Sequence, residues 1–279
     1  MDLVARINAL LWTWIQSMRS VKRISLFFPF LLFAVLQVGL LLLLIFFYLP
    51  PISSLLIPLI RLLSQESALH YPQFYFYLPG LFSKINVWLN LLASWLFVGA
   101  ATLMFAGKYR GRPVRTSRAL GQAFRRIIPL FAVGMVEWVV IRAVMQLFGY
   151  LTTSAGQWAT QSPRLFLLVG FFINIVFIVP FAYTAAEVML GKRSIGGALR
   201  GSFALARRNY GLTYLLFAVP SLLTLAMNLI FQYAPVIVTR TSPGVMVLLM
   251  IINIVVTVVV NFAIVGSLTA FYLRAAEQG

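Results

Sequence analysis

The stretch KRSIGGALRGSFALARRNYGLTYLLFAV, residues 192–219, joins a basic segment directly to an apolar one. Arg193, Arg200 and Arg207 recur at intervals of seven, so on a helix they form one basic stripe. Another face of the same helix carries small and apolar side chains: Ile195, Leu199, Ser202 and Ala206. The stretch therefore predicts a helix that lies on a membrane surface and leads into a membrane span.

The order of basic residues followed by Leu-Phe-Ala-Val occurs three times in the chain. The other two copies are Arg125-Arg126 before residues 130–133 and Lys22-Arg23 before residues 32–35. A feature used three times is most simply explained as a unit of construction. We therefore expect a triplicated architecture rather than a single binding motif at residues 192–219.

The amino-acid composition is that of an integral membrane protein. Of the 279 residues, 62% are hydrophobic and only 10% are charged, whereas a soluble domain has about 25% charged residues. The 22 Lys and Arg residues against five acidic ones give a net charge of +17, which suggests nucleic acid or anionic lipid as a partner. The long apolar runs decide for lipid and against nucleic acid. Accumulation of Lys and Arg in cytoplasmic loops explains much of the excess charge.

Six apolar runs are long enough to cross a hydrocarbon core of about 30 Å. The predicted spans are residues 26–48, 85–106, 127–150, 165–190, 214–233 and 245–273. Pro50-Pro51 ends the first span, and Pro180 predicts a kink in the fourth. The sequence thus predicts an all-α integral membrane protein with one polytopic domain over residues 1–279.

The connections between the spans contain further elements. Residues 1–25 and 108–126 predict two more surface helices, and residues 52–63 a short interfacial helix. On the first surface helix, the apolar face holds Leu3, Ile7, Leu10, Trp14, Met18 and Val21, and the polar face holds Arg6, Thr13, Gln16, Ser20 and Arg23. Residues 70–82 form an aromatic connection, either a belt packed on the spans or a docking surface. Residues 151–164 form a short polar connection.

The distribution of Lys and Arg predicts the orientation of the chain. Seventeen of the 22 fall in the amino-terminal segment, in the loops before the third and fifth spans and in the tail, and four fall on the other side. By the positive-inside rule, both termini are cytoplasmic. The predicted architecture is six transmembrane helices as three hairpins, each preceded by a cytoplasmic amphipathic basic helix, in a parallel repeat.

Basic residues in and beside the three amphipathic segments are predicted to bind anionic phospholipids. They are Arg19, Lys22, Arg23, Arg115, Arg118, Arg125, Arg126, Lys192, Arg193, Arg200, Arg207 and Arg208. A Lys or Arg near an anionic leaflet contributes about 1 kcal/mol of membrane binding. Lipid binding is either the purpose of these helices or only their anchor.

Two charged residues fall within the third predicted span. Glu137 comes eleven positions after Arg126, which places it about 16 Å into the membrane, where a charge is costly. Arg142 is the nearest basic candidate, but five positions place the two side chains about 140° apart on one helix. Pairing within the helix and pairing across helices therefore both stay open. Glu137 is either part of a proton or cation relay or a structural pair that sets helix register.

Other polar residues near the spans are predicted to be structural. Glu187 lies one turn before Gly191 and is expected to pair with a nearby cation, namely Lys192, Arg193 or Arg200. Four amides also lie within spans: Asn174, Asn228, Asn253 and Asn261. Such amides commonly form hydrogen bonds between transmembrane helices, so we expect them to hold the spans together.

Several kinds of chemistry are excluded by the residue types present. There is no cysteine, and the one histidine, His70, lies in a predicted external loop, so thiol chemistry and a zinc site are not expected. An intramembrane serine protease needs a base beside its serine, and His70 is not placed to be that base. No GxxxxGK[ST] phosphate loop occurs, so ATP hydrolysis by the chain is not expected either. We expect no catalytic residues, no metal and no cofactor, and therefore no enzyme.

The segment EVMLGKRSIGGALRGSFALARRNYG, residues 187–211, resembles one found in bacterial six-span proteins of the YciC-like kind. These are similar to the membrane domain of some glycerophosphoryl diester phosphodiesterases. The matching positions are Glu187, Gly191, Lys192, Ala198, Leu199, Ser202, Arg207 and Arg208. No soluble phosphodiesterase domain is present, so that activity is not implied. The resemblance implies a six-span protein of a bacterial inner membrane.

Two functions are compatible with these features. The first is a non-enzymatic scaffold or accessory subunit, whose spans pack against a membrane-protein partner or a second copy and whose basic helices lie on anionic lipid. The alternative is a transporter or lipid-handling protein, with a polar path between the repeats that includes Glu137 and Arg142.

Overall fold

The computed structural model describes residues 3–64, 66–154 and 163–277. Within these ranges the chain is helical and has no strand. Six helical segments are long and apolar enough to cross a membrane: Ile24–Ile45, Gln73–Tyr109, Ile127–Leu151, Arg164–Met189, Tyr210–Phe231 and Pro243–Glu277. The predicted all-α, multi-pass membrane fold class is confirmed at this level.

The helices follow one another with short connections. The α-helices are α1 (Leu3–Ser20), α2 (Phe28–Ile45), α3 (Ile52–Leu63), α4 (Gln73–Leu89), α5 (Trp95–Tyr109), α6 (Thr116–Arg125), α7 (Ile127–Ser154), α9 (Pro163–Ile178), α10 (Thr184–Met189), α11 (Ile195–Arg208), α12 (Tyr210–Phe231), α13 (Ala234–Arg240) and α14 (Pro243–Glu277). Four short turns of helix connect them: Ile24–Phe27, Glu66–Leu69 and Val179–Phe181 are 3₁₀, and Asn90–Ser94 is π. Residues 155–162 of the predicted connection lie outside the described residues.

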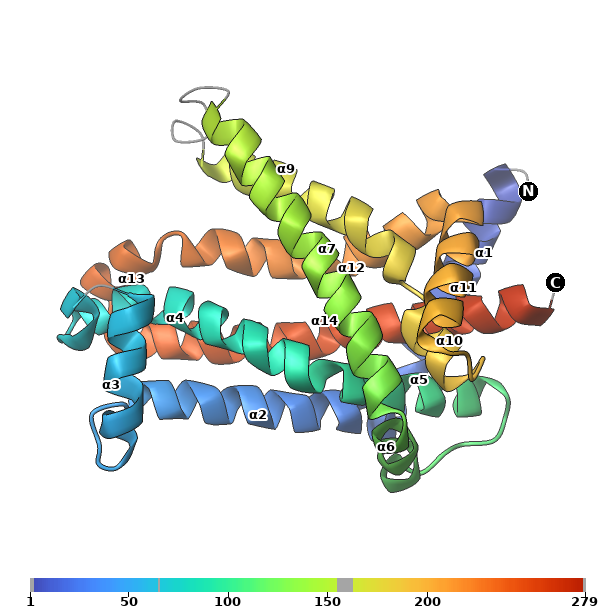
Figure 1. Cartoon of the computed structure of the whole chain (residues 1–279), viewed down its shortest axis with the longest axis horizontal. Coiled ribbons are helices and arrows are strands. Elements are labelled where there is room, and N and C mark those ends of the chain that lie inside the picture. Colours follow the sequence, from blue (N-terminus) through green and yellow to red (C-terminus); the bar gives the residue numbers. More distant parts are fainter. Residues whose placement is uncertain (1–2, 65, 155–162, 278–279) are drawn as a thin grey trace.

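Helix α14 is the centre of the arrangement. It packs against α1, α2, α5 and α12, and its second half is almost wholly buried, from Phe262 to Phe271 and at Leu273. In Figure 1, α2, α12 and α14 run along the long axis of the molecule, whereas α7 crosses them obliquely. Helices α1, α6, α10 and α11 gather at one end, beside the end of α14, and α3 and α13 lie at the other.

The second span differs from its predicted limits of residues 85–106. Its helical path begins at Gln73 and continues through the π-helical turn to Tyr109. Part of the predicted aromatic connection is therefore helix, because Phe74 and Leu78 are buried in one cluster with α2 and α14. The helix predicted over residues 52–63 is present as α3.

The fourth span is broken at the predicted kink. Proline has no N–H to continue a helix, and a 3₁₀ turn at Val179–Phe181 separates α9 from α10. The Ser202 hydroxyl of α11 donates to the Pro180 carbonyl (2.7 Å) and accepts from the Tyr183 N–H (3.0 Å). One side chain thus satisfies two backbone groups at the break. The remaining spans begin and end within about one turn of the predicted limits.

Helix α1 departs from its predicted faces at several positions, although Leu10 and Trp14 of the predicted apolar face do pack on the core. Thr13 and Ser20, predicted to face away from the apolar surroundings, are fully buried, and α1 packs on α14. Ile7, Met18 and Val21 are exposed instead. The reason is steric, since small side chains allow close helix approach while large apolar ones can face lipid. Leu3 and Arg6 belong to the same prediction, but their side chains lie outside the described part of the chain.

The other two amphipathic helices dock in the same way. Their fully buried residues are small and spaced four apart: Ala119 and Ala123 on α6, and Ala198, Ser202 and Ala206 on α11. Each helix therefore presents a narrow, small-residue face to the spans. Its basic side chains remain outside.

Candidate functional site

A cavity of about 980 Å³ lies among the spans, between α4, α5, α7, α10, α12 and α14. Its volume is at the upper end of the range for sites that hold small organic ligands. Ten polar or charged residues line it: Ser83, Lys84, Asn90, Ser94, Thr102, Glu137, Arg142, Thr184, Asn261 and Thr269. The rest of the wall is apolar and aromatic.

The cavity is open at one end and closed at the other. Lys84, Trp88 and Arg142 are exposed and form its mouth, between α4 and α7. Thr102, Thr184 and Thr269 are 1–2% exposed and form its floor, beside α10. Lys84, Trp88 and Arg142 belong to helical segments long and apolar enough to cross a membrane, so the mouth lies on the flank of these segments.

The wall between mouth and floor is shaped by two local features. The π-helical turn is held by the Ser94 hydroxyl, which donates to the Asn90 carbonyl (2.5 Å), and it places both residues on the cavity. Such π turns are frequent at functional sites. On α7, a Cβ at Gly134 would overlap the indole of Trp95. A glycine at this position therefore lets Trp95 lie against α7 and form part of the wall.

Glu137 and Arg142 both line the cavity, and they do not pair. Glu137 is half-buried and Arg142 is exposed. Within residues 3–64, 66–154 and 163–277, the ion pairs are Arg61–Glu66 and Glu187–Arg193, and neither Glu137 nor Arg142 has a hydrogen bond to a protein group. An ion pair between these two residues, one of the predicted alternatives, is therefore absent from the structure.

A third charge, Lys84, lies at the mouth. Its ammonium group donates to the carbonyl of Leu63, the last residue of α3 (2.5 Å). Lys84 lies just outside the predicted second span of residues 85–106, and only the extension of α4 brings it to the cavity. The cavity thus carries two cations and one acid, and charges at membrane depth are costly unless water or a ligand reaches them.

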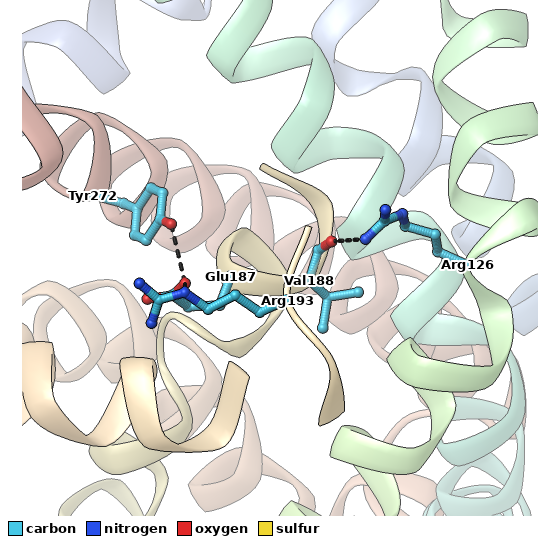
Figure 2. A network of polar contacts seen from close by, with 5 residues as sticks. All are labelled: Arg126, Glu187, Val188, Arg193 and Tyr272. Atoms are coloured by element: carbon cyan, nitrogen blue, oxygen red, sulfur yellow. Dashed lines mark hydrogen bonds and ion pairs between the residues drawn. The ribbon is translucent and has the colours of Figure 1, made fainter. Parts of the chain in front are cut away.

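The closed end is held by a cluster of polar contacts around Glu187 (Figure 2). Glu187 is 4% exposed, and its Oε2 accepts from the Tyr272 hydroxyl and contacts Arg193 Nε, each at 3.2 Å. Arg126 Nη1 donates to the Val188 carbonyl (2.7 Å). These contacts join α10 to α14, to the turn before α11 and to the junction of α6 and α7. Of the three cations predicted for Glu187, Arg193 is the one that pairs.

Two glycines make room for the Glu187 cluster. A Cβ at Gly201 would overlap both Arg193 Nη1 and Glu187 Oε1, and one at Gly191 would lie 2.8 Å from Glu187 Oε2. Lys192 adopts a positive φ of 52° in the turn between α10 and α11, a conformation that non-glycine residues rarely take. The positions of Gly191 and Gly201 relative to Glu187 therefore have a structural explanation: they allow residues 187–202 to form the junction that closes the floor of the cavity.

The end that contains α1, α5 and α14 is joined by further hydrogen bonds. Lys108 Nζ donates to Ser20 Oγ (2.5 Å), and the Tyr109 hydroxyl donates to the Gly266 carbonyl (3.1 Å). A Cβ at Gly266 would lie 2.8 Å from Ser17 Oγ. This end of the molecule is consequently packed tightly, in contrast to the mouth of the cavity.

The predicted lipid-binding residues divide into two groups. Arg126 and Arg193 make the protein contacts described above. The others are exposed at the end of the molecule that carries α1, α6 and α11: Arg19, Lys22, Arg23, Arg115, Arg118, Arg125, Lys192, Arg200, Arg207 and Arg208. Among the described residues, no group of three or more His, Cys, Asp or Glu side chains could hold a metal ion.

The predicted amide contacts between spans are mostly wrong. The side-chain oxygens of Asn174 and Asn253 are buried without a partner among the described residues, and Asn261 lines the cavity. A hydrogen bond between side-chain amides of two helices is formed instead by Gln37 on α2, whose Nε2 donates to Asn86 Oδ1 on α4 (3.1 Å). The threonines of the floor were also missed, because a threonine within an apolar run carries no signal of its own.

Comparison with family models, with curated proteins and with solved structures found no match to the chain. The resemblance of residues 187–211 to YciC-like proteins therefore stays a prediction. The function of the cavity is argued from its geometry and chemistry alone.

Proposed function

We propose that the protein is a non-enzymatic lipid-handling transporter, which admits an amphiphilic molecule from the bilayer into the cavity and moves it across the membrane. The observation that carries this proposal is the cavity of about 980 Å³, open between α4 and α7 and closed beside α10. The proposal takes up the second of the two alternatives left by the sequence, a polar path between the repeats.

A packing defect would look different. Protein interiors are close-packed, and cavities that remain empty are apolar. This cavity has ten polar or charged residues on its wall, including Glu137 and Arg142 within a span. Groups of this kind require solvation inside a membrane, so a wall built in this way supports regular occupancy by water and by a polar ligand.

The proposal includes an orientation. The chain lies in a bacterial inner membrane with both termini and the floor of the cavity toward the cytoplasm, and the mouth faces the outer half of the bilayer. The excess of Lys and Arg at the α1, α6 and α11 end supports this orientation. Contacts of α2 with α5, of α7 with α9 and of α12 with α14 support three hairpins, and the exposed basic residues would bind anionic lipid.

A cavity-filling variant tests the proposal. The purified protein would be placed in vesicles of phosphatidylethanolamine and phosphatidylglycerol with a trace of headgroup-labelled phosphatidylglycerol, and an impermeant quencher would follow movement between leaflets. Ser94→Trp should slow the movement by about tenfold or more, because Ser94 lines the cavity. Leu92→Trp, on the same turn but 62% exposed, is the matched control and should move lipid like the unsubstituted protein.

The scaffold function is the competing hypothesis, since a scaffold does not need the cavity. Movement no faster than in protein-free vesicles would contradict the transporter proposal and favour the scaffold. Equal rates for Ser94→Trp and Leu92→Trp would show that the cavity is not the path.

A further inference from the structure

We infer that the ligand of the cavity is a phospholipid with an anionic headgroup, whose phosphate binds between Lys84 and Arg142 at the mouth. The inference rests on the proposed function for the idea that the cavity is occupied, and it adds the chemical class of the occupant. It concerns equilibrium binding and does not require that the ligand is moved.

The first argument is the balance of charge. Three charged residues line the cavity, namely Lys84, Glu137 and Arg142, so the wall carries one net positive charge. The two cations are exposed at the mouth, whereas Glu137 is half-buried. A phosphodiester with one negative charge balances the formal charge of the wall and brings no further cation toward Lys84 and Arg142. A headgroup that adds an ammonium group would place that cation against Lys84 and Arg142.

The second argument is the supply of hydrogen-bond donors. Arg142 has no hydrogen bond or ion pair to a protein group in the described part of the chain, so its five N–H groups remain available, and the guanidinium fork matches a phosphate. Lys84 uses one donor on the Leu63 carbonyl (2.5 Å), which fixes the ammonium group near the mouth and leaves two donors. Oppositely charged donors and acceptors of this kind form strong hydrogen bonds.

The third argument concerns the source of the phosphate. The cations lie beside apolar side chains that also line the cavity and are exposed in spanning helices, Val87 (39%) and Trp88 (57%). Trp88 lies next to Trp138 of α7, with ring centroids 6.1 Å apart. Acyl chains can therefore lie along α4 and α7 while the phosphate reaches the cations. A soluble phosphate would have to cross this apolar border, so a lipid is the better fit.

Photo-crosslinking at equilibrium tests the inference. The protein would be placed in phosphatidylcholine vesicles with a small fraction of a photoreactive phospholipid bearing a glycerol, ethanolamine or choline headgroup, and crosslinks to α4 and α7 would be quantified by mass spectrometry. We expect phosphatidylglycerol to exceed the other two by about tenfold. Lys84→Gln combined with Arg142→Gln should abolish this preference. Lys84→Arg combined with Arg142→Lys should retain most of the preference. This charge-conserving variant shows whether a loss in the first variant comes from removed charge or from misfolding.

The matched control is Arg240→Gln, which removes an exposed cation of the α13 end that does not line the cavity; it should leave the preference unchanged. Equal crosslinking by all three lipids, or a preference for phosphatidylethanolamine, overturns the inference and leaves the proposed transport intact. Displacement of the lipid by excess glycerol phosphate also overturns it, because the ligand would then be a soluble phosphate. Selective crosslinking without movement between leaflets supports the inference and contradicts transport. No crosslinking by any lipid overturns both.

Discussion

Two carboxylates near the cavity differ in their surroundings: Glu187 beside its closed end has protein partners, and Glu137 on its wall has none among the described residues. At the closed end, Glu187 is 4% exposed and contacts both Arg193 and Tyr272. In the open part, Glu137 is half-buried and has no partner among the described residues. A buried charge whose partners are supplied by the protein stabilises one arrangement of helices. A charge without protein partners, on the wall of a cavity, is available to a ligand.

The glycines of the two regions show the same contrast. A Cβ at Gly201 would overlap both partners of the Glu187–Arg193 salt bridge, whereas a Cβ at Gly134 would overlap the Trp95 indole, which borders the cavity. An added methyl group must displace something at either position. The indole can move into the cavity, whereas Arg193 can move only by giving up its contact with the buried Glu187, so the two regions should differ in how they tolerate substitution.

The largest effect is expected for Glu187→Ala. The change leaves the Arg193 guanidinium and the Tyr272 hydroxyl without their partner, and breaking a buried pair costs about 3 to 5 kcal/mol. Arg193 is 53% exposed and can be hydrated, so we expect the free energy of unfolding to fall by about 2 kcal/mol. The measurement is the unfolding temperature in detergent, which should be lower. Glu66→Ala, which removes an exposed pair with Arg61, is the control and should change little. An unchanged unfolding temperature for Glu187→Ala would mean that the cluster does not hold the closed end.

The second largest effect is expected for Gly201→Ala, which should lower the free energy of unfolding by about 1 to 2 kcal/mol because the new methyl group displaces Arg193 from Glu187. The comparison is with Gly196→Ala on the same helix, where nothing lies within 4 Å of the added Cβ. Alanine is there the better helix former, so stability should rise by about 0.5 kcal/mol. Thermal unfolding of both variants measures the difference, and equal shifts would argue against tight packing around the salt bridge.

Gly134→Ala should cost less than Gly201→Ala, about 1 kcal/mol or below, because the Trp95 indole can turn into the cavity. The same movement should slow lipid movement between leaflets and alter the tryptophan emission spectrum. Gly39→Ala, which has open space around the added Cβ, controls for the change in helix propensity. A loss as large as that of Gly201→Ala would show that the wall is as tightly packed as the closed end.

The smallest effect on stability is expected for Glu137→Gln and Arg142→Leu. Neither change leaves a partner unsatisfied, so the free energy of unfolding should stay within about 0.5 kcal/mol of its original value or rise. Glu137→Gln should nevertheless abolish lipid movement if the carboxylate acts as a relay. Persistent movement would remove the relay role from Glu137 but not the cavity from the path. A stability loss comparable to that of Glu187→Ala would contradict the contrast between the two regions.

The local elements were predictable because they depend on neighbouring residues. Continuous apolar runs predict the six spans, and Pro180 predicts the break in the fourth because proline lacks an N–H. The helix over residues 52–63 follows in the same way. Errors arose where a segment has two apolar environments to choose from. Helix α1 turns its small polar residues inward and its large apolar ones outward, and the aromatic residues after 73 extend a span rather than form a connection.

The cavity was not predictable in the same way. Its wall combines residues from helices that are far apart in sequence, from α3 to α14, and Lys84 joins it only because α4 begins before the apolar run that predicts the second span. Glu137 and Arg142 were identified from their cost inside a span, but the choice between a pair and a wet wall depends on the course of α7 relative to α4 and α14. That course is set by packing at positions such as Gly134 and Trp95.

The sequence by itself determined the fold class and the number of spans, because hydrophobicity and length act locally and are read directly from the chain. It also marked Glu187, Glu137 and Arg142 as unusual, because a charge in an apolar run is costly wherever the run folds. Only the tertiary structure decided that Arg193 is the partner of Glu187 and that the other two residues face a cavity. The reason is that pairing depends on distances between helices, and those distances are set by how small side chains and glycines let the helices approach.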